Sequence, residues 1–312
     1  MNTFQEKTFI QEIKDPLFKQ YGISLFIKRE DLIHQHISGN KWHKLKYNIE
    51  AAKKQDKQTI LTFGGAYSNH IAATAYAGKI FNFKTIGIIR GENIPHLNPT
   101  LTFAHDCGMQ LEFISRTDYK EKNESHFIEK LEQKFGDFFL IPEGGNNILA
   151  VKGCSEMLEE VKNDYDYYSV SCGTGTTIAG MSICLDEKKE ILGFSALKGG
   201  DFLRQDIKNC LLDYNNLFDS NHKGLNFDIK TDYHFGGYAK INSELFEFVK
   251  TFKENFNIQL DYIYTGKMMF GIYDLIKKRY FNEGSKILAV HTGGIQGNDG
   301  IEIRFKEKLQ LF

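Results

Sequence analysis

The chain alternates between short apolar runs of strand length and longer segments whose apolar residues recur with the period of a helix. Such alternation predicts βαβ units, in which strands pair in parallel and helices cover both faces of an open sheet. Trp42–Lys54 and His70–Phe81 are typical amphipathic helices. The predicted strands are Leu25–Lys28, Thr59–Phe63, Thr85–Ile89, Gln110–Ile114, Phe138–Ile141, Tyr167–Val170, Ile191–Ser195 and Ile287–His291. The fold class that follows is α/β with mainly parallel sheets.

Three of the predicted strands end in a glycine-containing turn. The turns are Thr62–Gly65, Ser171–Gly175 and His291–Gly294. Ligands of open α/β sheets bind beyond the carboxyl ends of the strands. We therefore expect the three turns to meet at one ligand site.

Composition and charge exclude several classes of protein. The 312 residues include 39 basic and 40 acidic side chains, which gives a net charge of −1, and 41% of the residues are hydrophobic. These values are typical of a globular protein, and they favour neither nucleic acid nor an acidic membrane surface as a partner. A small zwitterionic molecule suits the balanced charge better.

The first residues and the cysteines bear on the compartment. Residues 1–22 contain no continuous apolar stretch that could form a signal peptide or a membrane helix. The five cysteines are odd in number and show no CxxC spacing. We expect a cytoplasmic protein without disulfides, without a metal site and without a membrane partner.

The segment Ser171–Gly180 has the composition of an anion-binding loop. Its glycines allow close backbone approach, and the N–H groups at the start of the following helix favour negative charge. A dinucleotide-binding fingerprint would need glycine at Ile178, and the chain has no GxxxxGK[ST] loop, so a nucleotide-dependent oxidoreductase is disfavoured. A turn that serves only strand-to-helix packing stays open. The residues expected to hold a phosphate, without help from a lysine, are Gly173, Thr174, Gly175, Thr176 and Thr177.

The segment Ser38–Tyr47 places two lysines, Lys41 and Lys44, in the first turn of a helix that Ser38 or Asn40 can cap. Cations oppose the helix dipole at this end. The positive helix end and Lys44 both favour a neutral amine at Lys41, which is the nucleophile that a Schiff base needs. The alternative is a basic, solvated helix face.

The segment Gly64–His70 also joins a strand to a helix. Ser68 and Asn69 are good N-cap residues, and the N–H groups behind such a cap can bind a carboxylate. A simple structural cap explains Ser68 or Asn69 equally well. His70 can act as an acid or base, or it can simply pack.

A reactive lysine, a phosphate loop and a carboxylate site are together the requirements of a pyridoxal-phosphate enzyme that acts on an amino acid. The chain resembles the fold type II pyridoxal-phosphate family that contains D-cysteine desulfhydrase and 1-aminocyclopropane-1-carboxylate deaminase. The resemblance covers nearly the whole chain. It rests on segments in family order, namely Ile27–Leu32, Ser38–Lys41, Gly64–His70, Pro142–Asn146, Ser171–Gly180, Gly236–Tyr238, Tyr264–Lys267 and His291–Gly294.

The resemblance implies a two-domain fold similar to the tryptophan synthase β subunit. The larger, cofactor-binding domain would comprise residues 1–43 and 153–312. The smaller domain, residues 44–152, would close over the substrate. The resemblance also implies a homodimer.

The resemblance further implies roles for single residues. Lys41 would form the Schiff base with pyridoxal 5′-phosphate, and Asn69 would contact the pyridoxal hydroxyl. Ser68, Asn69 and His70 would receive the substrate carboxylate, and Ser68 would also relay a proton. Tyr238 and Tyr264 match two catalytic tyrosines of the family that flank cofactor and substrate.

Two further positions separate the activities of the family. Deaminase members have Glu and Leu where this chain has Thr265 and Thr292, as in desulfhydrase-like members. A neutral threonine near the pyridine nitrogen gives a weaker electron sink than Glu, which suffices for loss of a thiolate. The family usually has Pro-Val where this chain has Tyr262-Ile263. The expected reaction is α,β-elimination of D-cysteine to pyruvate, ammonia and hydrogen sulfide; the alternatives are 1-aminocyclopropane-1-carboxylate deaminase and a non-catalytic ligand-binding relative.

Overall fold

The computed structural model describes residues 4, 8–92, 96–161, 164–186, 188–222 and 226–310, and within the last range it leaves out the side chains of 306–310. The strands are β1 (Ile10–Ile13), β2 (Ser24–Lys28), β3 (Thr59–Gly65), β4 (Lys84–Arg90), β5 (Met109–Ile114), β6 (Phe139–Ile141), β7 (Tyr167–Cys172), β8 (Glu190–Ser195), β9 (Asn226–Lys230) and β10 (Lys286–Val290). The α-helices are α1 (Pro16–Gln20), α2 (Asn40–Lys54), α3 (Asn69–Phe81), α4 (Pro99–Asp106), α5 (Ser125–Phe135), α6 (Ile148–Ser155), α7 (Thr176–Cys184), α8 (Leu203–Phe218), α9 (Ser243–Phe256), α10 (Thr265–Lys277) and α11 (Asn298–Gln310).

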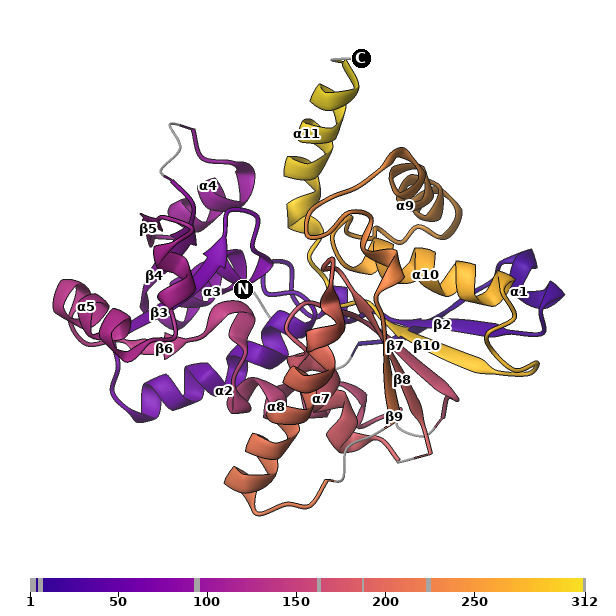
Figure 1. The fold of residues 1–312 in the computed structure, drawn as a ribbon, viewed down its shortest axis with the longest axis horizontal. Helices are drawn as coiled ribbons and strands as arrows, with labels where there is room; N and C mark the ends of the chain where they lie inside the picture. Colours follow the sequence, from indigo (N-terminus) through magenta and orange to yellow (C-terminus); the bar gives the residue numbers. More distant parts are fainter. Residues whose placement is uncertain are drawn as a thin grey trace.

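The strands form two separate sheets that lie side by side (Figure 1). The larger sheet has six strands in the order β1-β2-β10-β7-β8-β9, and the smaller one has four in the order β5-β4-β3-β6. All neighbouring strands pair in parallel except β1, which is antiparallel to β2. The larger sheet therefore combines strands from both ends of the chain, whereas the smaller one uses a continuous middle segment.

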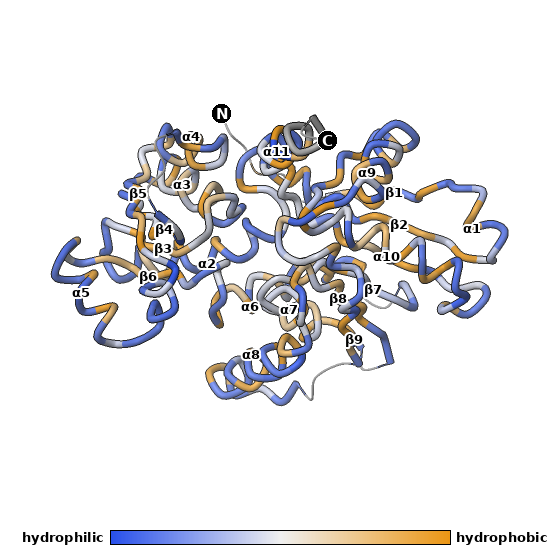
Figure 2. The backbone as a smooth tube through the Cα atoms, turned by 45° about the horizontal axis from the view of Figure 1, so that its top comes forward, coloured by the Kyte–Doolittle hydropathy of each residue, from blue (hydrophilic) through white to orange (hydrophobic). Residues whose placement is uncertain are grey.

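Each sheet is buried on both faces, as the apolar composition of its strands requires. In β10, Ile287 and Ala289 pack with α9 and α10, whereas Leu288 and Val290 pack with α6, α7 and α8 on the opposite face. The smaller sheet is covered by α2 and α3 on one face and by α5 on the other. Figure 2 shows hydrophobic backbone along the central strands and alternating hydropathy along α8. The α/β class with helices on both faces is thus confirmed.

All eight predicted strands are present, with ends that differ by one or two residues. The sequence analysis missed β1 and β9, the two edge strands of the larger sheet, which read IQEI and NFDIK and contain too few apolar residues to be recognised. Among the described residues, no helix is long and apolar enough to cross a lipid bilayer.

Candidate active site

A cavity lies between the two sheets, at the carboxyl ends of strands from both. Two of the three glycine-containing turns, Ser171–Gly175 and His291–Gly294, contribute to it, and the third side is formed by residues that follow the Thr62–Gly65 turn. The cavity is lined by Asn40, Lys41, Lys44, Ser68, Asn69, His70, Gly144, Ser171, Cys172, Gly173, Thr174, Gly175, Thr177, Ile178, Tyr238, Tyr264, Thr292 and Gly293.

A close backbone contact brings Lys41 to this cavity. The residue before α2, Gly39, has a φ of +60°, and a Cβ atom there would lie 2.0 Å from the carbonyl oxygen of Thr292. Only glycine allows this approach. The start of α2 therefore packs directly on the turn after β10, and Lys41, the second residue of the helix, lines the cavity.

The amine of Lys41 has an unusually low proton affinity. Burial, and secondly the positive charge of Lys44, lower the pKa of Lys41 to about 7. A large fraction of Lys41 is consequently a neutral nucleophile near neutral pH. The sequence analysis named Lys44 as a cause, but the larger cause is burial.

The predicted capping of α2 by Ser38 or Asn40 is wrong. The N-cap residue is Gly39, and it makes no side-chain cap hydrogen bond. Asn40 instead accepts a hydrogen bond from Nζ of Lys41 at 2.7 Å and donates through Nδ2 to the hydroxyl of Thr177 at 3.0 Å. Asn40 thus connects the reactive amine to the predicted phosphate loop. This contact was not predicted, because asparagine at this position was interpreted as a helix cap.

The predicted phosphate loop follows β7 and leads into α7, so its N–H groups lie at the positive end of a helix. Gly173, Thr174, Gly175 and Thr177 line the cavity, whereas the hydroxyl of Thr176 donates to the side chain of Asn146 and lies 3.1 Å from the hydroxyl of Thr174. The structure brings together four of the five residues that the sequence analysis assigned to the phosphate.

Lys44 lies beside the predicted phosphate loop, which was expected to hold a phosphate without a lysine. Nζ of Lys44 lies 3.0 Å from the carbonyl oxygen of Gly144 and 3.3 Å from the hydroxyl of Thr174. Because Lys44 follows Lys41 by three positions, both amines lie on one face of α2. From the sequence, Lys44 was expected only to affect the charge of Lys41; in the structure the amine of Lys44 also reaches the loop.

The turn after β3 places Ser68, Asn69 and His70 at the opposite wall of the cavity. Ser68 is the N-cap of α3, and its hydroxyl oxygen accepts a hydrogen bond from the backbone N–H of Ile71 at 3.3 Å. The first N–H groups of α3, on Asn69 and His70, have no acceptor within the helix. They form a preorganised site for a carboxylate, so the cap and the ligand site are compatible.

The side chain of His70 is buried and neutral. The hydroxyl of Thr62 donates to the carbonyl oxygen of Ile141 at 2.7 Å, so it accepts from Nε2 of His70 at 2.9 Å. Burial, together with the charges of Lys41 and Lys44, holds the pKa of His70 well below its usual value. His70 therefore contributes a neutral ring and a backbone N–H to the cavity wall. It does not supply a charged imidazolium at neutral pH.

Tyr238 and Tyr264 meet at the cavity, with ring centroids 6.2 Å apart in an edge-to-face arrangement. Burial raises the pKa of both phenols. Both hydroxyls stay protonated at neutral pH and are therefore able to donate a proton. The ring of Tyr264 also lies against Gly173, where an added Cβ would be 3.2 Å from Cε1.

Of the two threonines that the sequence analysis linked to substrate choice, only Thr292 lines the cavity. Its hydroxyl lies 3.2 Å from that of Ser171. The hydroxyl of Thr265 is fully buried and donates to the carboxylate of Asp261 at 2.6 Å. Asp261 also accepts from the backbone N–H groups of Ile263 and Tyr264, so it fixes the start of α10 next to the tyrosine.

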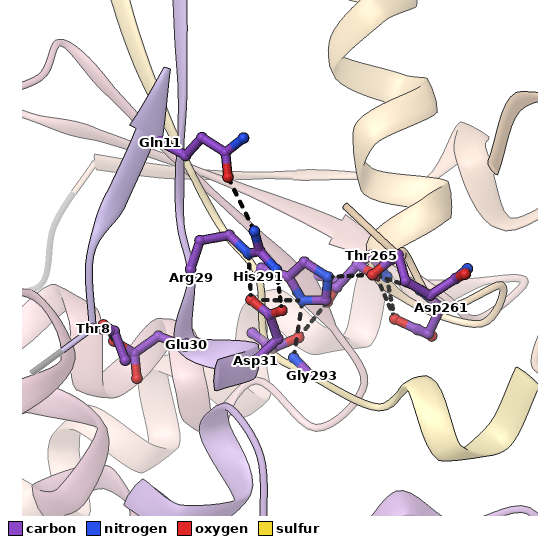
Figure 3. A network of polar contacts seen from close by, with 12 residues as sticks. Thr8, Gln11, Arg29, Glu30, Asp31, Asp261, Thr265, His291 and Gly293 are labelled. Carbon is purple, nitrogen blue, oxygen red and sulfur yellow. Dashed lines mark hydrogen bonds and ion pairs between the residues drawn. The ribbon is translucent and has the colours of Figure 1, made fainter. Parts of the chain in front are cut away.

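A buried polar network supports the turn that carries Thr292 (Figure 3). His291 donates through Nε2 to the carbonyl oxygen of Gln259 at 2.8 Å, and its Nδ1 accepts from the N–H of Gly293 at 3.2 Å. Asp31, which is held by two hydrogen bonds from Arg29, lies 3.8 Å from Nδ1 of His291. The network accounts for the buried charges of Arg29 and Asp31, which follow β2.

The residues that line the cavity fit pyridoxal phosphate. An amine with a pKa of about 7 can condense with an aldehyde, and the glycine loop together with Lys44 can hold a phosphate. The two groups belong to one cavity and are connected through Asn40.

Comparisons with known proteins agree with this fit. Residues 8–293 match the family described as pyridoxal-phosphate dependent enzyme. The chain is 32% identical over 301 residues to the bifunctional D-cysteine desulfhydrase/1-aminocyclopropane-1-carboxylate deaminase, mitochondrial, of Arabidopsis thaliana, which covers 88% of this chain and 73% of the relative.

Solved structures share the fold. A crystal structure of an ACC deaminase homologue matches with a TM-score of 0.84 and 25% identity over 97% of this chain and 95% of the other. A hydrogen sulfide-producing enzyme from Fusobacterium nucleatum matches with a TM-score of 0.63 and 16% identity over 93% and 96% of the two chains, which shows the fold alone. The chain therefore belongs to the pyridoxal-phosphate-dependent enzyme family, in the group of the 1-aminocyclopropane-1-carboxylate deaminases and D-cysteine desulfhydrases.

Proposed function

We propose that the protein removes sulfide from D-cysteine, with pyruvate and ammonia as the other products. The observation that carries the proposal is the amine of Lys41, which has a pKa of about 7 and lines the same cavity as the glycine loop and Lys44. When bound, pyridoxal phosphate supplies an electron sink for the α-carbon of an amino acid. Lys41 would hold its aldehyde, and the 173–177 loop with Lys44 would hold its phosphate.

The cavity residues support an elimination. The substrate carboxylate would bind the N–H groups at the start of α3, next to the Ser68 hydroxyl. Nζ of Lys41 would accept the proton from the α-carbon, since its lowered pKa leaves it free to act as a base near neutral pH. Tyr264 or Tyr238 would donate a proton to the departing sulfur, because both phenols stay protonated. With one water, D-cysteine gives pyruvate, ammonia and hydrogen sulfide.

The choice of D-cysteine over the cyclopropane substrate rests on residues 265 and 292. Both are neutral threonines, and the hydroxyl of Thr292 is the one that borders the cavity. Neither threonine places a carboxylate at the cavity, which leaves the cofactor a weaker electron sink than the Glu of the deaminase members would. Loss of a thiolate needs less stabilisation of the carbanion than opening of a cyclopropane ring, so the threonines favour desulfhydration.

A substrate panel tests this choice. The purified protein, loaded with pyridoxal phosphate, is incubated with D-cysteine, L-cysteine, D-serine and 1-aminocyclopropane-1-carboxylate, and keto acid and sulfide are measured. We expect both products from D-cysteine at the highest kcat/KM. Keto acid from the cyclopropane compound alone would show a deaminase instead, and no turnover of any substrate would favour a ligand-binding protein.

A matched pair of lysine variants tests the role of Lys41. Lys41→Ala is expected to abolish the visible absorption of the lysine-bound cofactor and the release of sulfide. Lys54→Ala, at the exposed end of the same helix, removes the same charge and is expected to leave both unchanged. Equal spectra in the two variants would refute the assignment.

The proposal includes a cytoplasmic homodimer in which the smaller domain, residues 44–152, closes over the substrate. Light scattering of the purified protein tests the dimer. Small-angle scattering with and without a slowly reacting amino acid tests closure, for which a decrease of the radius of gyration is expected.

A further inference from the structure

A hydrogen bond from Gln296 connects the turn after β10 to the start of α3. It lies in the 3₁₀ turn Ile295–Gly297 that follows β10, and its Nε2 donates to Oδ1 of Asn69 at 2.6 Å. Asn69 is 227 positions away in the chain, at the start of α3. Gln296 follows β10 of the larger sheet, whereas Asn69 belongs to the helix that covers the smaller sheet.

This hydrogen bond selects one of the two orientations of the Asn69 amide. An amide presents an acceptor at one end and donors at the other. Since Oδ1 of Asn69 is paired with Gln296, Nδ2 is left as the donor end of the amide. Asn69 lines the cavity, so this donor is available to a ligand there.

Gly294 gives the amide its space. It has a φ of +93°, and an added Cβ would lie 2.4 Å from Nδ2 of Asn69. Any side chain at position 294 would displace the amide. The turn after β10 thus contributes both the room for Asn69, through Gly294, and the hydrogen bond that orients it, through Gln296.

We propose that Gln296 is a positioning residue that turns the Asn69 amide so that Nδ2 donates to the phenolic oxygen of the cofactor. The inference rests on the proposed function and on the contact of Asn69 with this oxygen that the family resemblance implies. A donated hydrogen bond stabilises the ionised phenolate over the neutral phenol. Gln296 thereby sets the protonation of the cofactor without touching it.

The substitution Gln296→Glu tests the inference, because it keeps the shape of the side chain and replaces its donor by acceptors. The carboxylate attracts Nδ2 of Asn69, so the amide turns and presents Oδ1 to the phenolic oxygen. Gln296→Leu removes the hydrogen bond to Oδ1 of Asn69 and offers no acceptor to Nδ2. Gln133→Glu, at an exposed position of α5, is the control for the added negative charge.

The readout is the absorption of each variant, loaded with pyridoxal phosphate and titrated with pH in the absence of substrate. The measured quantity is the pH at which the near-ultraviolet and visible forms are equally populated. Loss of one hydrogen bond to the phenolate is expected to raise this pH by about one unit in Gln296→Glu and by less in Gln296→Leu. Gln133→Glu should titrate like the wild type.

The outcomes separate the inference from the proposed function. The role of Gln296 alone would be overturned if both Gln296 variants had a normal visible band and the pH midpoint of the wild type, while Asn69→Ala had a shifted midpoint. Absence of the visible band from the wild type would overturn the proposed function and the inference together. Circular dichroism of each variant shows that its fold is retained.

Discussion

Nζ of Lys44 lies 3.3 Å from the hydroxyl of Thr174, so the first turn of α2 supplies an amine to the predicted phosphate loop as well as the amine of Lys41 to the cavity. The two lysines share a helix face but differ in their partners. Nζ of Lys41 donates to the neutral side chain of Asn40, whereas Nζ of Lys44 donates to the carbonyl oxygen of Gly144 and lies near the loop. In the proposed function, Lys41 would therefore bind the aldehyde and Lys44 the phosphate.

The substitution Lys44→Met is expected to weaken binding of pyridoxal phosphate by about 10- to 150-fold, since a hydrogen bond to a charged group contributes about 1.5–3 kcal/mol. Fluorescence titration of the cofactor-free protein measures the affinity. Pyridoxal, which lacks the phosphate, should lose much less affinity than pyridoxal phosphate. Equal losses for the two compounds would show that Lys44 does not act on the phosphate.

The substitution Thr265→Val is expected to lower the free energy of unfolding by about 1–3 kcal/mol, because it leaves buried polar groups without partners. The hydroxyl of Thr265 donates to the carboxylate of Asp261 and accepts from its backbone N–H at 2.8 Å. Chemical denaturation measures the loss, and Thr265→Ser, which keeps the hydroxyl, should be close to the wild type. A stable Thr265→Val variant with an altered cofactor spectrum would instead indicate contact with the cofactor.

The substitution Lys267→Met is expected to loosen the loop that carries Tyr238. Nζ of Lys267 donates to the carbonyl oxygens of His234 and Gly237, each at 2.8 Å, and the side chain is almost fully buried. Loss of both bonds should lower kcat and increase proteolysis within residues 234–238, while the visible band of the cofactor persists. Lys250→Met, at an exposed position of α9, is the matched control. A variant with wild-type kcat and proteolysis would contradict this role.

The apolar strands and the glycine-containing turns could be predicted from the sequence because each is a local pattern. Eight strands, and the convergence of the Ser171–Gly175 and His291–Gly294 turns, follow from apolar runs and from the geometry of parallel sheets. The edge strands β1 and β9 could not be predicted, since one side of an edge strand lacks a neighbour and its sequence needs fewer apolar residues. The domain boundaries at residues 44 and 152 stay a prediction.

The site was predictable as a set of residues but not as a set of contacts. Lys41, Ser68, Asn69 and Thr292 stand beside glycine turns, so their place at the cavity follows from the motif. The contact between Gln296 and Asn69 joins residues far apart in the chain and has no local signal. The burial that lowers the pKa of Lys41, and the orientation of Thr265 toward Asp261, likewise depend on the packed tertiary structure.

The pH dependence of aldehyde capture tests the environment of Lys41. Burial and the charge of Lys44 lower the pKa of Lys41 from 10.5 to about 7, and only the neutral amine attacks an aldehyde. The rate at which the cofactor-free protein captures pyridoxal, followed by stopped-flow absorbance, should therefore rise with pH up to about 7 and then level off.

The effect of the Lys44 charge on the pKa of Lys41 can be tested separately. Removing that charge in Lys44→Met raises the pKa of Lys41, because the protonated amine no longer faces a second cation. The midpoint of pyridoxal capture should move to higher pH in this variant and stay in place in Lys54→Met, whose lysine lies at the other end of α2. Pyridoxal has no phosphate, so a weaker phosphate contact cannot account for the shift. A wild-type midpoint near that of free lysine would show that Lys41 is solvated and that its position, rather than its proton affinity, prepares it for the aldehyde.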